Sequence, residues 1–312
     1  MTGGAVGYAL FEKNRRVQVS DGTAIAYAEL GRGRRIPVVL ANGWSCSDAY
    51  WADVAPHLSA LGHKVLLPDN RGHGESGLPR PPGFRARNIT RADVSVDRMA
   101  RDLLEVCDDA EVDEAVFVGH SMGVQTILEV YRHAPDRARG LVAVAGPYEN
   151  PMKTFYGVGY FDRLFPIGHF AARLMPELLT PALRVGLKST RWSYNAAVAL
   201  KAATRKLSAE RLAPYLAHLA TRDPLVLFKM LESMRDHSAA DLLPGLTTPL
   251  LVLAGRKDAF TPPAAQQKMH ELAPGSEIVW FDDGGHCLPL EEPEGVIAAI
   301  ERFLEKIEAT GA

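Results

Sequence analysis

Ser121 lies between two glycines, Gly119 and Gly123, directly after a short run of Val and Phe. A serine that attacks a carbonyl carbon must present its hydroxyl to the substrate while staying hydrogen-bonded to a base. A sharp turn from a strand into a helix meets this need, because the side chain then projects beyond the sheet edge. The glycines are needed because a Cβ there would collide with the neighbouring strand or helix. Ser121 is therefore the candidate nucleophile, and a serine that merely caps a helix is the simpler alternative.

A nucleophilic serine also needs a base and an acid that orients the base, and two later loops carry these residue types. Asp258 follows the strand-like run Pro249–Gly255, and His286 lies in a Gly-rich turn after the run Glu277–Asp283. Loops that follow parallel strands meet at the carboxyl edge of the sheet, where open α/β sheets bind ligands. His286 is therefore predicted to take the Ser121 proton, with Asp258 fixing the tautomer of the imidazole.

Other residues compete for the roles of base and acid. His73 is an alternative base on residue type alone, and Glu149, after the sixth predicted strand, is an alternative acid. Asp282 and Asp283 precede the candidate base, but their place at the end of their own strand predicts that they point elsewhere. His120, next to the nucleophile, is interpreted as a packing residue on the opposite side of the turn.

The elements that must position these residues alternate between strand and helix along the chain. Eight short runs are typical of strands: Val17–Val19, Ala24–Glu29, Ile36–Gly43, Lys64–Asn70, Ala115–Ser121, Leu141–Pro147, Pro249–Gly255 and Glu277–Asp283. Most of the later runs are apolar throughout, as expected for strands that are covered on both faces. Helix-like segments lie between them: Ser47–Leu61, Val96–Asp109, Met122–His133, Pro263–Leu272 and Glu294–Glu308. This order predicts a mostly parallel eight-stranded sheet flanked by helices, with right-handed crossovers.

One interval breaks this alternation. Residues 148–247 contain helix-like stretches and several prolines but no convincing strand. An interval of about 100 residues is far longer than an ordinary crossover. We therefore predict a helical cap over 148–247, inserted into a discontinuous core of residues 1–147 and 248–312. Its aromatic residues are expected to form the core of the cap, with some lining a substrate cleft: Phe155, Tyr156, Tyr160, Phe161, Phe165 and Phe170.

The composition is that of an ordinary globular protein. The 312 residues are 47% hydrophobic and 23% charged, and a net charge of −2 gives no basic surplus for nucleic acid or an anionic membrane. No apolar run approaches the roughly 18 residues of a membrane span, and no signal peptide is recognised. The cysteines Cys46, Cys107 and Cys287 have no metal-like spacing. They predict free thiols in a reducing compartment, which indicates a cytoplasmic location.

Five segments together resemble the α/β-hydrolase superfamily, in the capped branch that includes esterases, C–C bond hydrolases and cofactor-free haloperoxidases. In the order of the family's landmarks they are ANGWSCSDAYW, DNRGHGESG, GHSMG, LAGRKDAFTP and DDGGHCLPLEEPE. The resemblance implies an oxyanion hole formed by the backbone N–H groups of Trp44 and Met122. The chain departs from the family at Asn42, where His is usual. A backbone donor survives this change, because the side chain is not the donor.

These residues predict hydrolysis of a carboxylic ester or lactone through an acyl-enzyme, with no metal or organic cofactor. The expected substrate pocket is aromatic and apolar, which favours a hydrophobic acyl or aryl group. Its expected residues are Asn42, Trp44, Met122, Phe155, Tyr156 and Leu288. Ser121 argues against dehalogenase and epoxide-hydrolase chemistry, which uses an Asp nucleophile at this turn. The same triad also suits C–C or thioester hydrolysis, perhydrolysis or acyl transfer, and a non-catalytic ligand-binding protein is an alternative of another class.

Overall fold

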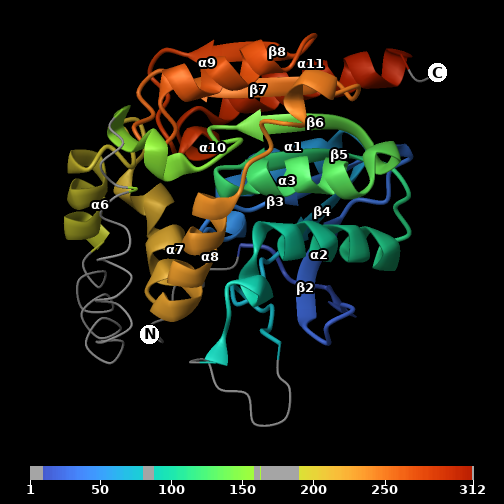
Figure 1. The fold of residues 1–312 in the computed structure, drawn as a ribbon, viewed down its shortest axis with the longest axis horizontal. Coiled ribbons are helices and arrows are strands. Elements are labelled where there is room, and N and C mark those ends of the chain that lie inside the picture. The colour runs from blue at the N-terminus through green and yellow to red at the C-terminus, as the bar shows by residue number, and fades with distance from the viewer. Residues whose placement is uncertain (1–9, 80–87, 158–161, 163–189, 311–312) are drawn as a thin grey trace.

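The computed structural model describes residues 10–79, 88–157, 162 and 190–310, and its centre is one eight-stranded sheet. The strand order is β1-β2-β4-β3-β5-β6-β7-β8 (Figure 1). The strands are β1 (Arg15–Gln18), β2 (Ala24–Leu30), β3 (Arg35–Ala41), β4 (His63–Pro68), β5 (Ala115–His120), β6 (Ala138–Val144), β7 (Leu250–Gly255) and β8 (Glu277–Phe281). β2 runs antiparallel to β1 and β4, and all other neighbours are parallel. The predicted mostly parallel sheet of eight strands is confirmed.

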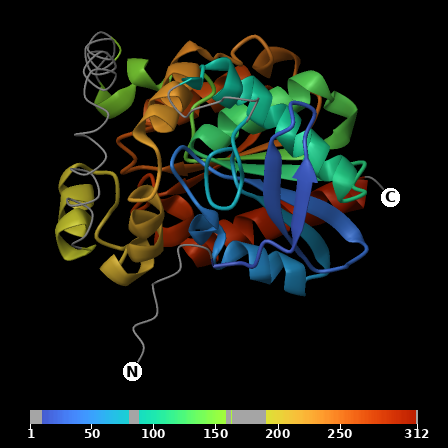
Figure 2. The ribbon, with the colours of Figure 1, turned by 90° about the horizontal axis from the view of Figure 1, so that it is seen from below.

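Helices cover both faces of this sheet (Figures 1 and 2). They are α1 (Val54–Ala60), α2 (Val96–Asp109), α3 (Met122–His133), α9 (Pro263–Leu272), the short α10 (Leu288–Glu291) and α11 (Pro293–Thr310). The predicted segment 47–61 divides into a 3₁₀ turn, Asp48–Trp51, and α1. Pro56 lacks a backbone N–H, which costs least in the first turn of a helix, and α1 begins two residues before it.

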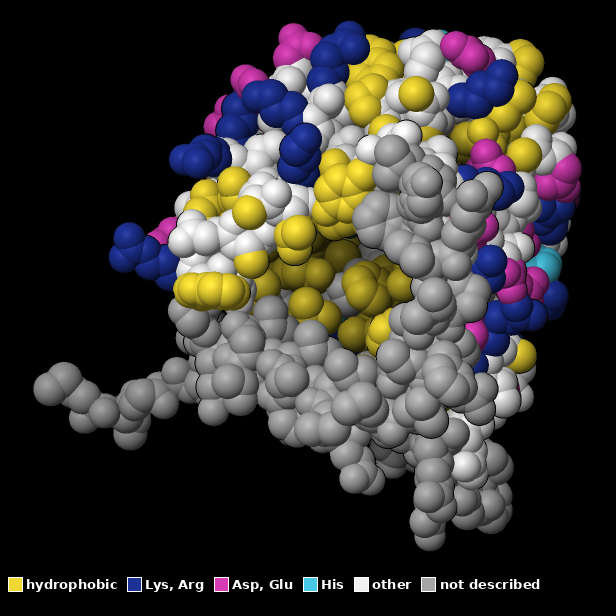
Figure 3. Space-filling model, turned by 60° about the vertical axis from the view of Figure 1, so that its left-hand side comes forward, with side chains coloured by type: hydrophobic (Ala, Val, Ile, Leu, Met, Phe, Trp, Pro, Cys, Tyr) yellow, Lys and Arg dark blue, Asp and Glu magenta, His cyan; other side chains and the backbone are white. Residues whose placement is uncertain are grey.

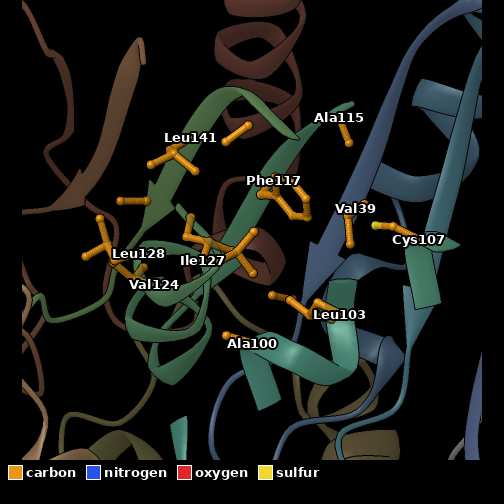
Figure 4. Packing of buried hydrophobic residues seen from close by; sticks show 14 of the residues in the cluster. Val39, Ala100, Leu103, Cys107, Ala115, Phe117, Val124, Ile127, Leu128 and Leu141 are labelled. Atoms are coloured by element: carbon orange, nitrogen blue, oxygen red, sulfur yellow. The ribbon is translucent and has the colours of Figure 1, made fainter. Parts of the chain in front are cut away.

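The core consists of two layers, one on each face of the sheet. Successive strand residues point to opposite faces, so Val116 and Phe117 of β5 belong to different layers. Phe117 packs in the layer that contains Leu103 of α2 and Ile127 of α3 (Figure 4). Val116 packs in the layer that contains Ile300 of α11. Because both faces are buried, β5 is apolar from Ala115 to Val118, and its end is held on both sides.

The interval between β6 and β7 consists of helices joined by loops, as far as the structure describes it. It contains α6 (Thr190–Ala199), α7 (Ala209–Leu219), α8 (Pro224–Asp236) and short 3₁₀ turns, and no strand among the described residues. Ser208 and Asp223 begin α7 and α8 by accepting backbone N–H groups of the first turn, which stabilises both helix starts. We call the described part of residues 148–247 the helical segment; its division into a separate cap remains a prediction. None of the helices in the described ranges has the length and apolar character to cross a membrane.

Candidate active site

The turn that carries Ser121 is sterically constrained. Ser121 is the single residue between β5 and α3, with φ 55° and ψ −121°. A Cβ on Gly119 would lie 2.3 Å from the Gly123 oxygen, and a Cβ on Gly123 would lie 2.3 Å from the Ala41 oxygen of β3. Only glycine fits at either position, for the reason that the sequence indicated. The Ser121 hydroxyl makes no capping hydrogen bond to α3, which removes the helix-cap alternative.

Three predicted residues form one hydrogen-bonded chain at the carboxyl edge of the sheet. The Ser121 Oγ lies 3.0 Å from Nε2 of His286, and Nδ1 of His286 lies 3.2 and 3.1 Å from the two carboxylate oxygens of Asp258. The Asp258 side chain is completely buried, and Oδ1 also accepts the N–H groups of Phe260 and Thr261 at 2.8 Å each. With Nδ1 as the donor to this fixed carboxylate, Nε2 of the neutral ring is free to accept the serine proton.

The alternative base and acids have other partners. His73 is buried and donates from Nδ1 to the Arg71 oxygen, and burial lowers its pKa to about 4. Glu149 pairs with a lysine of the helical segment, and Asp282 and Asp283 pair with exposed basic side chains of the loop after β7. Within the described part of the chain, none of these four side chains contacts the Ser121 hydroxyl or the His286 ring.

His120 is a buried packing residue, as the sequence suggested, but it lies against the candidate base and not on the opposite side of the turn. Its Nε2 donates to the His286 carbonyl oxygen at 2.8 Å, and its ring stacks on Tyr50 with centroids 4.6 Å apart. Burial, followed by the neighbouring His286 ring, lowers the His120 pKa to about 3, so the His120 ring is neutral. His120 thus holds the backbone of the candidate base through this hydrogen bond. The sequence contained a sign of this position. Side chains alternate along a strand, so His120 lies on the same face of β5 as Val118, the face that packs against Trp51.

The loop Gly43–Cys46, which we call the oxyanion loop, lies directly against the nucleophile. A Cβ on Gly43 would lie 3.0 Å from the Ser121 Cβ. Among the described residues, no protein acceptor receives the backbone N–H of Trp44 or of Met122. The Met122 N–H begins α3, where the helix dipole favours negative charge. Two unpaired donors beside a candidate nucleophile are the arrangement that an oxyanion requires.

Asn42, the departure from the resembling family, braces the start of this loop. Its Oδ1 accepts from Nε1 of Trp51 at 3.0 Å, and its Nδ2 donates to the Pro68 oxygen at 3.0 Å. Both ends of the amide are used within the core, so Asn42 fixes the loop without facing a ligand.

A cavity of about 440 Å³ opens above Ser121 and is almost entirely apolar. It is lined by Trp44, Cys46, Tyr50, His120, Ser121, Pro147, Pro151, Met152, Phe155, Ala202, Tyr215, Leu231, Met234, Phe260, Thr261 and His286. No Lys, Arg, Asp or Glu is part of this lining, as far as the described residues form it. Figure 3 shows a hollow with hydrophobic side chains on this face of the molecule.

The match to known proteins agrees with this geometry. Residues 36–293, more than half of the chain, match the family described as the alpha/beta hydrolase fold. The chain belongs to this family. A protein named as a candidate carbamate hydrolase, RutD of Azorhizobium caulinodans, is 26% identical over 279 residues, covering 88% of this chain and 92% of the relative. The family and this relative support hydrolase activity.

Two further comparisons show how widely this α/β hydrolase resembles other members of the fold. The karrikin insensitive 2 receptor CA of Petunia hybrida is 24% identical, with 88% of this chain and 93% of the receptor covered. The structure of a thermophilic esterase from Thermogutta terrifontis superimposes with a TM-score of 0.67 and 25% identity, covering 94% of this chain and 99% of the esterase. The proteins that resemble this chain thus include both an enzyme and a receptor.

The structure places the six predicted pocket residues in three different environments. Trp44 and Phe155 line the cavity of this α/β hydrolase, and Tyr156 lines a second cavity, whose wall includes the loop of Asp258. Asn42, Met122 and Leu288 are not on the cavity wall. Asn42 is held as described above, while Met122 and Leu288 are fully buried in separate hydrophobic clusters. Their backbone is near the site, but their side chains point into the core. The other aromatic residues expected at the cleft, Tyr160, Phe161, Phe165 and Phe170, lie outside the described residues.

The wall residues that the sequence did not single out come mainly from the helical segment. Met152, Tyr215, Leu231 and Met234 belong to this segment, and Tyr50 follows the oxyanion loop. Amphipathic helices bury such residues whether or not a ligand is present, so their pattern carried no specific signal. The three cysteines are free and buried, and burial raises the pKa of Cys46 to about 12.

One group of side chains outside the cavity has the residue types of a metal site. Asp97, Glu129 and His133 bring their ligand atoms within 4.8 Å of one another on α2 and α3. Both carboxylates already form ion pairs with arginines, Arg101 and Arg132. The positive charge that a cation would supply is therefore already present.

Proposed function

We propose that this α/β hydrolase cleaves a neutral carboxylic ester or lactone with a hydrophobic acyl or aryl group, through an acyl-enzyme on Ser121. The observation that carries the proposal is the hydrogen-bonded chain Asp258–His286–Ser121 at the floor of an apolar cavity, beside two unpaired backbone donors.

The acylation step follows from these contacts. As the Ser121 Oγ attacks the carbonyl carbon, His286 Nε2 takes its proton, and Asp258 stabilises the imidazolium that results. The oxyanion of the tetrahedral intermediate accepts hydrogen bonds from the N–H groups of Trp44 and Met122. Loss of one such donor typically lowers the rate by about 10²–10³-fold. The C–O bond to the leaving group then breaks, and His286 protonates the departing alcohol oxygen.

Deacylation repeats this sequence with water. His286, again neutral, accepts a proton from a water molecule that attacks the acyl carbon of the Ser121 ester. The second tetrahedral intermediate collapses, the Ser121 oxygen takes the proton back from His286, and the carboxylic acid leaves. A lactone would give the ring-opened hydroxy acid by the same steps.

The character of the cavity supports a neutral, hydrophobic substrate. A charged group in this cavity would lose its hydration, and no ionic side chain among the described residues of the wall replaces it. Burying an unpaired ion costs several kcal/mol or more. The helical segment acts as a cap in this proposal, because Met152, Tyr215 and Met234 supply much of the apolar wall.

The first test is turnover of p-nitrophenyl esters with short to medium acyl chains by the wild type and by Ser121→Ala. We expect the wild type to be active, with the chain-length optimum reporting the pocket size, and the alanine variant to lose about 10⁴-fold or more in kcat. A variant that kept the wild-type rate would contradict an acyl-enzyme on Ser121.

The similarity to a petunia receptor favours a second candidate, a ligand-binding protein on the same fold. A single experiment distinguishes the two functions. A hydrophobic lactone or a neutral carbamate ester is titrated into wild type and Ser121→Ala, with product measured by chromatography. Saturable binding to both proteins without product would favour the binding function, whereas product from the wild type alone supports the hydrolase.

A further inference from the structure

The oxyanion loop has a conformation that must be stabilised by its neighbours. The Cys46 N–H donates to the Gly43 oxygen at 3.3 Å, which makes Trp44 and Ser45 the central residues of a tight turn. Ser45 has φ 59°, in the left-handed region that glycine or asparagine usually occupies. An L-residue held there is strained unless surrounding contacts fix it. Ser45 itself is completely buried.

Helix α7 supplies two contacts to this one residue. The Tyr215 hydroxyl and the Ser45 Oγ share a hydrogen bond at 3.0 Å, and His218 Nδ1 lies 3.0 Å from the Ser45 carbonyl oxygen. Tyr215 and His218 are three residues apart, so they project from the same face of α7. The helix therefore holds both the side chain and the backbone of Ser45.

The direction of the His218 hydrogen bond is fixed by its other ring nitrogen. The Gly74 N–H donates to Nε2 of His218 at 3.2 Å, so Nε2 carries no proton and Nδ1 is the donor to Ser45. His218 is buried, and burial, followed by the nearby His73 and Arg222, lowers its pKa to about 3. The ring is thus neutral over the working range of a serine hydrolase, in the tautomer that the contact with Ser45 requires.

A third contact from the same segment reaches the neighbouring residue. Nε1 of Trp44 donates to the Leu227 oxygen of α8 at 2.8 Å. The Trp44 side chain and Ser45 are therefore both attached to helices of the helical segment, while the N–H of Trp44 stays unpaired beside Ser121.

We propose that Tyr215 and His218 are positioning residues of the active site: by holding Ser45, they keep the Trp44 N–H directed at the oxyanion. This inference rests on the proposed function. It assigns to α7 a role in the chemical step, beyond that of a pocket wall. The loop would otherwise be free to relax at Ser45 and turn the Trp44 peptide away from the oxyanion.

The test uses Tyr215→Phe and Ser45→Ala, each of which removes one partner of the hydrogen bond between these two side chains, and the double variant. We expect each single variant to lower kcat for the best p-nitrophenyl ester by about tenfold, less than the loss of a whole oxyanion donor, with KM changed by less than about threefold. The double variant should be no slower than the singles, because all three lack the same bond. A raised KM with unchanged kcat would show that Tyr215 is only a wall residue.

His218 allows a rescue experiment. His218→Leu removes the donor to the Ser45 oxygen, and we expect a loss in kcat similar to that of Tyr215→Phe. His218→Asn places an amide N–H near the position of Nδ1 and should recover most of this loss. Equal activity of the two variants would overturn the role of the donor. Thermal unfolding of every variant checks the fold, and Tyr131→Phe, whose hydroxyl contacts Thr247 on the surface, is the unaffected control.

Labelling by a fluorophosphonate separates failure of this inference from failure of the proposed function. Phosphonylation of Ser121 also develops negative charge on oxygen, and it requires no particular acyl group. If the wild type is labelled but no ester is turned over, the ester function is wrong, and labelling rates of the variants still test the inference. Labelling of Tyr215→Phe and His218→Leu at the wild-type rate overturns it. A wild type that is not labelled at all overturns both.

Discussion

The two backbone donors that flank Ser121 are held in different ways. The Met122 N–H is the first of α3, and its direction follows from the helix, from the tight turn after β5 and from two glycines that admit no Cβ. The Trp44 N–H belongs to an irregular loop whose shape depends on side chains from more distant parts of the chain. One donor is therefore fixed by secondary structure, and the other by tertiary contacts.

This difference teaches which parts of the site tolerate change. Every atom that fixes Met122 is within a few residues of it or on the adjacent strand, so no surface element has to be in place. Trp44 is oriented correctly only when α7 and α8 are docked. Disturbance of the first donor should therefore appear as lost stability, and disturbance of the second as lost rate in a protein that is still folded.

The largest effect is expected from Gly123→Ala, which disturbs the turn that fixes the Met122 donor. The new Cβ would lie 2.3 Å from the Ala41 oxygen, a backbone atom that cannot rotate away. We expect a loss of about 3–5 kcal/mol in the free energy of unfolding and a soluble yield reduced in proportion. Urea unfolding followed by fluorescence measures the change.

Gly245→Ala is the matched control for this variant. A Cβ on Gly245 meets no atom within 4 Å. Its free energy of unfolding should stay within about 1 kcal/mol of the wild type. Equal stability of the two alanine variants would contradict the steric account of the Ser121 turn.

An intermediate effect is expected from pH, which acts on stability through a buried histidine that packs beside His218. His73 lies beside His218 with ring centroids 5.5 Å apart, and burial lowers its pKa from the ordinary 6.5 to about 4. Between about pH 6.5 and 4 the unfolded chain binds a proton at His73 that the folded chain does not, so stability falls as the pH falls. This contribution is about 1.4 kcal/mol per pH unit.

His73→Asn isolates the contribution of His73 to the pH dependence of stability. The asparagine amide can replace the Nδ1 donor to the Arg71 oxygen, but it does not titrate. The free energy of unfolding of the variant is measured by urea at pH 6.5, 5.5 and 4.5. As the pH falls, it should decrease less steeply than that of the wild type, by about 1.4 kcal/mol per pH unit, the slope for one proton. Parallel curves would show that His73 is protonated equally in both states.

The smallest effect is expected from Trp44→Phe. This change keeps an aromatic ring in the cavity wall and removes the donor to the Leu227 oxygen. One hydrogen bond of this kind contributes about 1 kcal/mol, so kcat should fall by roughly fivefold if the bond orients the Trp44 peptide. Steady-state kinetics on the best ester measures it. An unchanged kcat would show that α7 alone holds the oxyanion loop.

The same distinction explains how much could be predicted from the sequence. The eight strands and the bounds of α2, α3 and α9 follow from local patterns, because most of the strands are apolar runs that end at a turn. The parallel sheet then placed Ser121, Asp258 and His286 at one edge, and the structure has them hydrogen-bonded.

The cavity wall was harder to predict because it is made by tertiary contacts. Trp44 and Leu227 are 183 residues apart in the sequence, and Ser45 and Tyr215 are 170 apart. No local pattern reports such a pairing. For the same reason the sequence did not reveal that Met122 and Leu288, both expected in the pocket, bury their side chains in separate hydrophobic clusters.

The shared use of α7 has a consequence for protein engineering. Cap segments are attractive targets for exchange between related hydrolases, since a new segment brings a new pocket. In this protein the helix that shapes the pocket with Tyr215 also carries His218, which contacts the oxyanion loop. A transplanted segment would therefore alter substrate preference and reaction rate together, unless the residues facing Ser45 are carried over with it.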